Sequence, residues 1–559
     1  MTEHTTVNGG RLLVDSLIAQ GANRIFTVPG ESFLAVLDAL HDSPEIQTVV
    51  CRQEGGAAFM ACADGALTGQ PGVCFVTRGP GATNASIGVH VAMQDSQPLL
   101  LFIGDVDRGM KDREGFQEVD FGAMFAPLAK LVLRIDDPAR IPEYVARAWS
   151  VALSGRPGPV VIALPEDMLL QVVSGVAPRP AITRPAQAVC PDAMGVLMEL
   201  IGGAAAPIAI VGGAGWHAKA REHFTAFAER IGLPVAGAFR RQDAISNASP
   251  VWAGNLGYGP GPKLVERIRA ADLIIAVGAR LGEATTDGYT LITPEHPGQV
   301  LVHVHPDPNE LGRVYRPDLA ICADMAEFAE AANLRGGDLF SFEAGREAHG
   351  EWLDWSNVQR DAKPAPYALD MAACVTAMRA ALPVDSIICN GAGNFSGWWH
   401  RYWHYDGFPT QLAPTAGAMG YGVPAAVAAA LRHPERTVVA LAGDGDFLMN
   451  GQELATAVQY GCDLLVVLID NSSYGTIRMH QEREFPARIS ATTLHNPDFA
   501  ALAQAYGGWS ARVETTAQFT EALAVAQSRK GLRMLHLIID VEQLSAGGAT
   551  ISGLRARAK

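Results

Sequence analysis

The chain has 559 residues, of which 48% are hydrophobic and 18% charged, a balance typical of a globular protein with several domains. Its formal net charge of −15 argues against a nucleic-acid partner, because phosphate backbones bind basic surfaces. No run of about 18 apolar residues is present, and the first residues lack a basic segment followed by an apolar one. We therefore expect neither a membrane span nor a signal peptide.

Short apolar runs alternate with helix-like segments along the chain, and each run is followed by Gly, Pro, Asp or Asn. Runs without polar alternation indicate strands buried on both faces of parallel sheets, with helices between them. Ligands of such sheets bind beyond the carboxyl ends of the strands. The sequence thus predicts an α/β fold of doubly wound parallel sheets, with strands within 24–30, 72–81, 98–105, 159–165, 207–215, 272–280, 299–308, 386–393, 437–446 and 463–471.

Two linkers divide this series. The segment 173–193 carries four prolines, and the segment 334–370 ends in KPAP after a polar helical stretch. Proline fixes φ and prevents a helix from continuing, which suits a connection between domains. We predict domains at 1–180, 190–340 and 360–559. The eight cysteines are scattered without a CxxC pair, which is typical of buried, reduced thiols in a cytoplasmic enzyme.

Polar residues with a chemical role stand at several strand ends. Glu54 follows an apolar strand and opens an alanine-rich segment, although a glutamate at a helix start is ordinary. In the last third, Asp444 and Asn471 follow the strands 437–443 and 463–470 of one βαβ unit. Neighbouring strand ends bring such side chains together, and Mg²⁺ prefers carboxylate, amide and phosphate oxygens. Two unrelated capping turns are the alternative.

The pattern GDG, then a helix and a strand, then DNSSYG resembles the thiamine diphosphate fingerprint of the acetolactate synthase and pyruvate decarboxylase superfamily. The family usually has Asn-Asn where this chain has Asp470-Asn471, and the metal ligand is the second of the two. The resemblance implies Mg²⁺ ligands at Asp444, Asn471 and the Ser473 carbonyl. It also implies three α/β domains, which are pyrimidine-binding, central Rossmann-like and diphosphate-binding.

Other segments resemble further parts of the family's cofactor site, among them VPGES, GPGATN, NGAGNF and GAMGYG. A bulky side chain, here Met419, would wedge between the two rings of the cofactor, although a Met in an apolar stretch is ordinarily core filling. The resemblance implies cofactor contacts at Pro29, Gly30, Asn84, Gly393, Asn394, Phe395, Gly417, Met419, Gly443, Gly445, Asp446, Tyr474 and Gly475.

The resemblance gives Glu54 a catalytic role. In this superfamily a glutamate in the context RxExGAA lies against the cofactor pyrimidine and promotes loss of the C2 proton. Removal from water raises the pKa of a carboxyl group, so that it exchanges protons near neutrality. In these enzymes the glutamate and the diphosphate site belong to different subunits, which implies a homodimer or homotetramer with the active site at the subunit interface.

The substrate side combines agreement with departures. GFQEVDFGAMFAPLAK resembles the acetolactate synthase branch and implies Phe116 and Lys130 as substrate contacts and Gln117 as a catalytic residue. His480 stands where acetolactate synthases have a tryptophan, and it is a candidate proton donor to an alkoxide. Ser32 replaces a histidine of some aldehyde lyases and is a candidate substrate contact.

The middle third carries G-x-G-x-x-A at 213–218 after a strand, which is a weak dinucleotide signal, and the strand in 232–239 lacks a terminal acid. This domain binds FAD in some relatives and nothing in others. The segment 277–289 departs from the pattern of the FAD-using acetolactate synthases, so FAD is possible but not favoured.

We expect an enzyme that uses thiamine diphosphate and Mg²⁺ to decarboxylate a 2-oxo acid such as pyruvate and to ligate the remainder to a carbonyl acceptor. A decarboxylase or an acyloin or 2-hydroxyacyl lyase of the same superfamily is the main alternative. A regulatory paralogue without turnover is less favoured, because Glu54, Asp444 and Asn471 are all present. A flavin or nicotinamide oxidoreductase that uses the middle domain is also less favoured.

Overall fold

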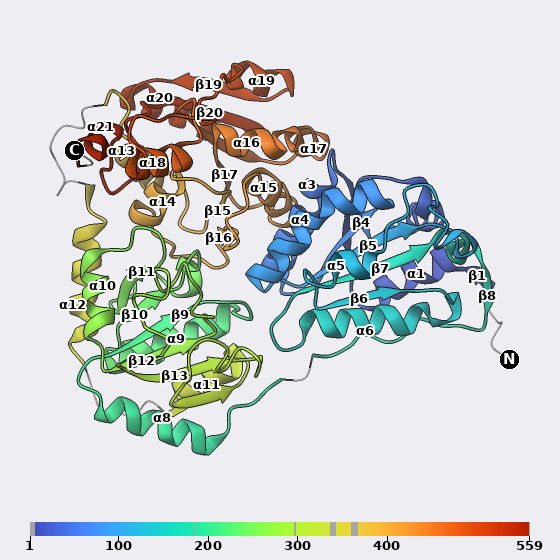
Figure 1. The fold of residues 1–559 in the computed structure, drawn as a ribbon, viewed down its shortest axis with the longest axis horizontal. Helices are drawn as coiled ribbons and strands as arrows, with labels where there is room; N and C mark the ends of the chain where they lie inside the picture. Colours follow the sequence, from blue (N-terminus) through green and yellow to red (C-terminus); the bar gives the residue numbers. More distant parts are fainter. Residues whose placement is uncertain (1–5, 185, 296–297, 336–341, 359–366, 558–559) are drawn as a thin grey trace. The chain divides into compact units, whose positions relative to one another are not determined.

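The computed structural model describes residues 6–184, 186–295, 298–335, 342–358 and 367–557. They contain three six-stranded sheets, and all the strand pairs within these three sheets are parallel. Each predicted strand is present, and each sheet lies within one of the three predicted ranges (Figure 1). The α/β fold of three parallel-sheet domains is therefore confirmed.

The first sheet has the strand order β3-β2-β4-β5-β7-β6. Helices α1, α2 and α6 cover one face through an apolar core that includes Leu13, Phe75, Phe102 and Trp149. Its strands are β2 (Arg24–Thr27), β3 (Gln47–Val50), β4 (Gly72–Val76), β5 (Leu99–Asp105), β6 (Leu131–Arg134) and β7 (Pro159–Pro165), and its main helices are α1 (Gly9–Ala19), α2 (Leu34–His41), α3 (Glu54–Thr68), α4 (Gly79–Asp95) and α6 (Ile141–Leu153).

The second sheet has the order β11-β10-β9-β12-β13-β14, with separate apolar clusters on its two faces. Its strands are β9 (Pro207–Val211), β10 (Val235–Gly237), β11 (Trp252–Asn255), β12 (Leu273–Val277), β13 (Val300–His305) and β14 (Leu319–Cys322), and its helices are α8 (Pro191–Gly203), α9 (Ala218–Ile231), α10 (Pro262–Ala270), α11 (Met325–Arg335) and α12 (Ala344–Trp355).

The third sheet has the order β16-β15-β17-β18-β20-β19. Its strands are β15 (Ile387–Asn390), β16 (Gln411–Leu412), β17 (Val438–Gly443), β18 (Leu464–Asp470), β19 (Trp509–Val513) and β20 (Leu532–Ile538). Its helices are α13 (Met371–Ala381), α14 (Ser396–Tyr402), α15 (Gly422–Arg432), α16 (Asp444–Asn450), α17 (Leu454–Gln459), α18 (Gly475–Glu484), α19 (Phe499–Ala505), α20 (Thr516–Gln527) and α21 (Ile551–Arg557).

The chain forms two compact units. Two pieces of the C-terminal sequence, Val427–Arg432 and Asn450–Tyr460, belong with Met1–Pro185, and the remaining residues form the second unit. Within the first unit, the Arg432 guanidinium donates to both carboxylate oxygens of Asp64 at 2.8 and 2.6 Å. None of the helices in the described part of the chain combines the length and apolarity needed to cross a membrane.

Candidate active site

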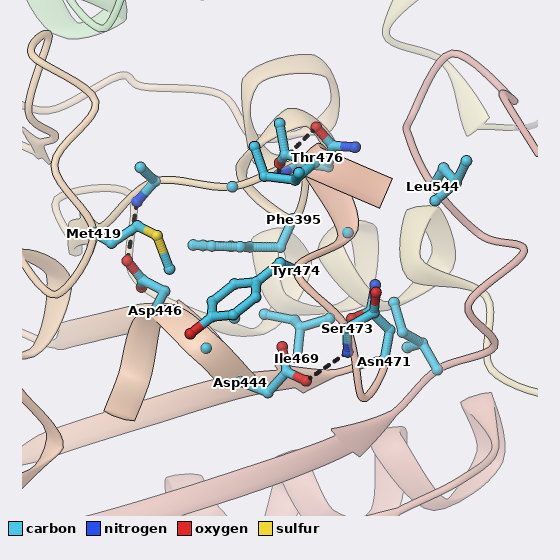
Figure 2. A pocket seen from close by; sticks show the side chains of 18 of the residues that line it. Phe395, Met419, Asp444, Asp446, Ile469, Asn471, Ser473, Tyr474, Thr476 and Leu544 are labelled. Atoms are coloured by element: carbon cyan, nitrogen blue, oxygen red, sulfur yellow. Dashed lines mark hydrogen bonds between the residues drawn. The ribbon is translucent and has the colours of Figure 1, made fainter. Parts of the chain in front are cut away.

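A cavity of about 250 Å³ opens at the carboxyl ends of β15, β17 and β18, where the fold class places ligands. Figure 2 shows Met419 at one side, Asn471 and Ser473 at the other, and the rings of Phe395 and Tyr474 between them. The lining comprises 392–395, Trp398, Gly417, Met419, 443–446, Ile469, Asn471, 473–477, Ile539, Gln543 and Leu544.

The predicted metal ligands lie together at this edge. β17 and β18 are adjacent, with Gly443 opposite Ile469, so Asp444 and Asn471 stand one and two residues beyond these paired positions. The Ser473 N–H lies between them and donates to the Asp444 carboxylate at 3.2 Å and to the Asn471 amide oxygen at 3.1 Å. The Ser473 carbonyl accepts from the Gly475 N–H at 2.7 Å. The structure thus brings the Asp444 and Asn471 side chains to the same N–H group, and their role as metal ligands stays a prediction.

Burial raises the pKa of Asp444 to about 6, and the charge of Asp470 adds to this effect. Among the described residues, no group of three or more His, Cys, Asp or Glu side chains is arranged to hold a metal ion. A carboxylate, an amide oxygen and a carbonyl are the kinds of ligand that a hard cation such as Mg²⁺ accepts, with its remaining oxygens from phosphate and water.

Asp470, where the family has Asn, is held by its own partners. One of its oxygens lies 3.0 Å from Nε2 of buried His536, and the other accepts from the Ser472 N–H at 2.8 Å. Burial alone would raise the pKa of Asp470, but these hydrogen bonds outweigh it and hold the pKa below its ordinary value. The Asn496 amide bridges Asp444 and Asp470 with two 2.8 Å hydrogen bonds. Asn496 was missed in the sequence because no motif marks it.

The Asp446 side chain joins two loops behind the cavity. It is buried, and its Oδ1 accepts from the Gly420 N–H at 2.8 Å and the Ala392 N–H at 3.1 Å. Burial raises the pKa of Asp446 to about 7. The sequence predicted a cofactor contact near Asp446, whereas the structure gives its side chain the further task of fixing the loops that carry Met419 and Asn394.

Glycines leave room on the cavity floor. A Cβ at Gly445 would lie 2.5 Å from the Tyr474 ring, and one at Gly443 would lie 3.0 Å from the Phe395 ring. Gly417 has φ +68°, which favours glycine. The Thr476 hydroxyl accepts from the Asn394 N–H and donates to the Asn394 amide oxygen, both at 3.0 Å, and so fixes the loop after β15.

In the first unit, the structure brings Glu54 and Asn84 together. Glu54 is the first residue of α3, and its carboxylate accepts from the Asn84 amide of α4 at 2.9 Å. Pro29 and Gly30 follow β2, and a Cβ at Gly30 would lie within contact distance of the Thr77 side chain. The two segments resembling the pyrimidine side of the family's site thus lie at the same edge of one sheet.

The predicted substrate residues separate into two groups. Gln117, with φ +63°, lines a cavity of about 780 Å³ with Asp105 and Arg134, and the Phe116 side chain is 71% exposed. Ser32 is fully buried and hydrogen-bonded to Thr77 at 2.9 Å.

The Lys130 ammonium donates to the carbonyls of Val151, Ser154 and Arg156 at 2.6 to 2.7 Å. It thereby satisfies carbonyls at the end of α6, where a helix leaves them without partners. In this structure both Ser32 and Lys130 are engaged by hydrogen bonds within the protein, and their contacts with substrate stay a prediction.

His480 does not line the cavity beside the metal loop. It lies on α18, is exposed, and its Nδ1 is hydrogen-bonded by Arg483 of the same helix. The next residue toward the cavity is Ile477, which lines it. The proton-donor role of His480 stays a prediction.

Three family models match the chain, and together with the site they define a thiamine diphosphate enzyme. They are the thiamine pyrophosphate enzyme N-terminal TPP binding domain at residues 7–124, the central domain at 195–332 and the C-terminal TPP binding domain at 391–537. Each model falls on one of the three sheets.

Similar curated proteins indicate the branch of this family to which the chain belongs. The acetolactate synthase large subunit of Parasynechococcus marenigrum is 33% identical over 532 residues, which cover 90% of this chain and 82% of the relative. The acetolactate synthase isozyme 2 large subunit of Escherichia coli is 31% identical over 542 residues, covering 96% of each chain. The large subunit of Corynebacterium glutamicum is 31% identical over 550 residues, with 96% and 86% covered. The chain belongs to the acetolactate synthase-like family of thiamine diphosphate enzymes.

Proposed function

We propose that this enzyme decarboxylates a 2-oxo acid of the pyruvate type and joins the remaining fragment to a second carbonyl compound, with Mg²⁺ and thiamine diphosphate. The proposal rests on one observation above all: Asp444, Asn471, Ser473 and Met419 line a single cavity. Relatives named acetolactate synthase, with the chain covering at least four fifths of their length, favour ligation over simple decarboxylation.

The residues present fit the cofactor. Asp444, Asn471 and the Ser473 carbonyl would hold Mg²⁺, and the open floor at Gly443 and Gly445 would accept the diphosphate. When bound, the cofactor supplies a nucleophilic carbon and takes up the electron pair released with CO₂. The protein contributes positioning and charge: Glu54 would hold a proton at the pyrimidine, and Asn84 would orient the Glu54 carboxylate.

We further propose a homodimer or homotetramer, in which Glu54 of one subunit serves the metal site of another. Six of the eight cysteines are buried in the structure, as expected of thiols in the reducing cytoplasm. The proposed enzyme does not use a flavin bound to the central domain. The Trp216 indole donates to the Gly212 carbonyl at 2.8 Å, and a Cβ at Gly278 would lie 2.7 Å from the Met325 sulfur, so these side chains pack against the glycines that follow β9 and β12. An absorbance spectrum of the purified protein tests this expectation.

The deciding experiment follows CO₂ and organic products together, with pyruvate, thiamine diphosphate and Mg²⁺ supplied. We compare the natural chain with Glu54→Gln and with Glu45→Gln, a change at an exposed glutamate of the same unit. Acetolactate that disappears only in Glu54→Gln supports the proposal. Acetaldehyde as the sole product makes the protein a decarboxylase instead, and failure to bind the cofactor refutes the proposal.

A further inference from the structure

Glu453 is a fully buried carboxylate in the segment Asn450–Tyr460, which belongs to the first compact unit. It ends a short 3-10 turn, Gly451–Glu453, just before α17. Burying an ionisable carboxyl group without partners is costly, so the contacts of this side chain identify what it does.

Its two oxygens accept hydrogen bonds from the turn that leads into α3. Oε1 accepts from the Arg52 and Gln53 N–H groups, each at 3.0 Å, and Oε2 accepts from the Thr456 hydroxyl at 2.6 Å. Arg52 and Gln53 are the two residues directly before Glu54. The N–H groups around a helix start have no intrahelical acceptors, and a negative charge there is favoured by the helix dipole.

The surrounding chain is shaped to admit this carboxylate. A Cβ at Gly56, in the first turn of α3, would lie 2.7 Å from Glu453 Oε1 and 3.0 Å from its Cδ. Seven residues further along the same segment, the Tyr460 hydroxyl accepts from the Val50 N–H at 2.8 Å and lies 3.1 Å from the Thr48 carbonyl. The segment therefore fixes the backbone from the end of β3 to the start of α3.

The Glu54 carboxylate is anchored by the Asn84 amide of α4. The position of its Cα depends on the backbone of residues 52 and 53, and that backbone is held by Glu453. A shift of about 1 Å at a catalytic group costs on the order of a hundredfold in rate.

We propose that Glu453 is a positioning residue, which aims Glu54 at its target by holding the Arg52 and Gln53 N–H groups. This inference rests on the proposed role of Glu54 and adds a residue to which neither the family resemblance nor the comparisons assign a task. Burial raises the pKa of Glu453, and the hydrogen bonds from Thr456 and from the two N–H groups oppose that rise.

The test uses Glu453→Ala and the conservative Glu453→Gln, which retains one acceptor oxygen. The first readout needs no cofactor: backbone amide hydrogen exchange in the apoprotein, followed in a peptide that covers residues 50–56. The second readout is the rate at which the C2 proton of bound thiamine diphosphate exchanges for deuterium, measured beside the cofactor Kd. Gln459→Ala is the matched control, because Gln459 lies in the same segment but accepts from the Arg52 side chain.

We expect faster amide exchange at residues 52 and 53 and a C2 exchange rate lower by at least about tenfold in Glu453→Ala, with a smaller loss in Glu453→Gln. The cofactor Kd should change much less, and Gln459→Ala should match the natural chain. In a Glu54→Gln background, Glu453→Gln should cause no additional loss, since both residues then act through one missing group.

Three results overturn the inference. The first is a C2 exchange rate in Glu453→Gln and Glu453→Ala equal to that of the natural chain, whatever happens to the melting temperature. The second is full additivity with Glu54→Gln. If Glu453→Ala does not fold, Glu453→Gln decides by the same criteria. The third is a natural chain that binds no cofactor, which refutes the proposed function and this inference together.

Discussion

Two neighbouring aspartates at the end of β17 differ in whether their proposed role requires a negative charge. Asp444 faces Asn471 across the Ser473 N–H, whereas Asp446 accepts two backbone N–H groups through one oxygen, Oδ1. An asparagine can reproduce the second arrangement but not the charge that a cation requires.

We therefore predict opposite outcomes for the same chemical change. Asp444→Asn should weaken Mg²⁺-dependent cofactor binding by roughly a hundredfold, about 2.7 kcal/mol, whereas Asp446→Asn should change it less than about threefold. Asp446→Ala, which frees the Ala392 and Gly420 N–H groups, should lower both stability and affinity. Cofactor titration by calorimetry measures the difference. Equal losses in the two asparagine variants would contradict the assignment.

His400 gives a prediction about pH. It is 6% exposed, and its burial, reinforced by the charge of Arg240, lowers its pKa to about 3. In the unfolded chain a histidine binds its proton near pH 6.5. Between these values the unfolded state holds more protons, so stability decreases as pH falls from about 6.5, by up to about 1.4 kcal/mol per pH unit for this group.

His400→Phe should keep the edge contact with Phe239 and flatten this dependence. The melting temperature, measured at steps from pH 7 to pH 5, should fall less in the variant than in the natural chain. His41→Gln, at an exposed histidine, is the control and should leave the slope unchanged. A slope identical in all three proteins would show that His400 protonates in the folded state.

Residues within one motif could be predicted from the sequence, and residues held by distant partners could not. The Asp444, Asn471 and Ser473 cluster follows from two strand ends of one βαβ unit. Asn496 and Glu453 act through contacts with segments 26 to 401 positions away in the chain, and no local pattern marks them. Lys130 resembled a substrate residue, yet the carbonyls at the end of α6 are its partners.

At the scale of elements, α18 is tied to the C-terminal helix α21. Glu482, 1% exposed, accepts from Arg555 through both oxygens at 2.8 Å and from Arg478 of its own helix at 2.8 Å. Arg555 is the main cause that lowers the pKa of Glu482 to about 2. The pairing holds α21 against the helix that begins at Gly475, on the rim of the cavity.

Arg555→Ala should release α21 and destabilise the docked state by about 2 kcal/mol, the contribution of hydrogen bonds to a charged group. Limited proteolysis should then cut within residues 545–557 several times faster, and amide exchange there should rise. Arg557→Ala, on the same helix and exposed, provides the comparison. Unchanged protection in Arg555→Ala would mean that apolar contacts, such as those of buried Ile551, hold the helix instead.

The strand predictions depended on uninterrupted apolar runs. They therefore omitted strand β20, whose sequence contains charged and polar residues. β20 runs LRMLHLI in the interior of the third sheet, and its Arg533 and His536 break the apolar pattern. In the structure Arg533 pairs with Asp463 and His536 with Asp470, so both polar side chains are satisfied. Such pairings are tertiary and cannot be read from a window of sequence.

At the scale of the whole molecule, the domain boundaries stay a prediction, and of the two compact units the first includes Val427–Arg432 and Asn450–Tyr460. Exposed apolar side chains remain in both units. Ile87 of α4 and Val458 of α17 are each 42% exposed, and Leu448 and Met449 of α16 are 50% and 47% exposed. Single exposed apolar side chains are ordinary on a protein surface, so the proposed assembly rests on the family resemblance and not on them.

The proposed assembly makes a prediction about mixed subunits. If Glu54 of one subunit completes the metal site of its partner, Glu54→Gln and Asp444→Asn damage complementary halves of each site. A heterodimer of the two variants would then hold one site with both changes and one site with neither. Random reassembly of equal amounts should recover about a quarter of the natural activity, since half of the dimers are mixed and each has one intact site.

The measurement is turnover after the two inactive variants are unfolded and refolded together, beside each variant refolded alone. The natural chain carried through the same treatment corrects for losses in refolding. Activity that appears only in the mixture requires that the site be shared between subunits. A mixture as inactive as its components, while the natural chain recovers, would place Glu54 and Asp444 in the same site of one chain, and the interface model would have to be abandoned.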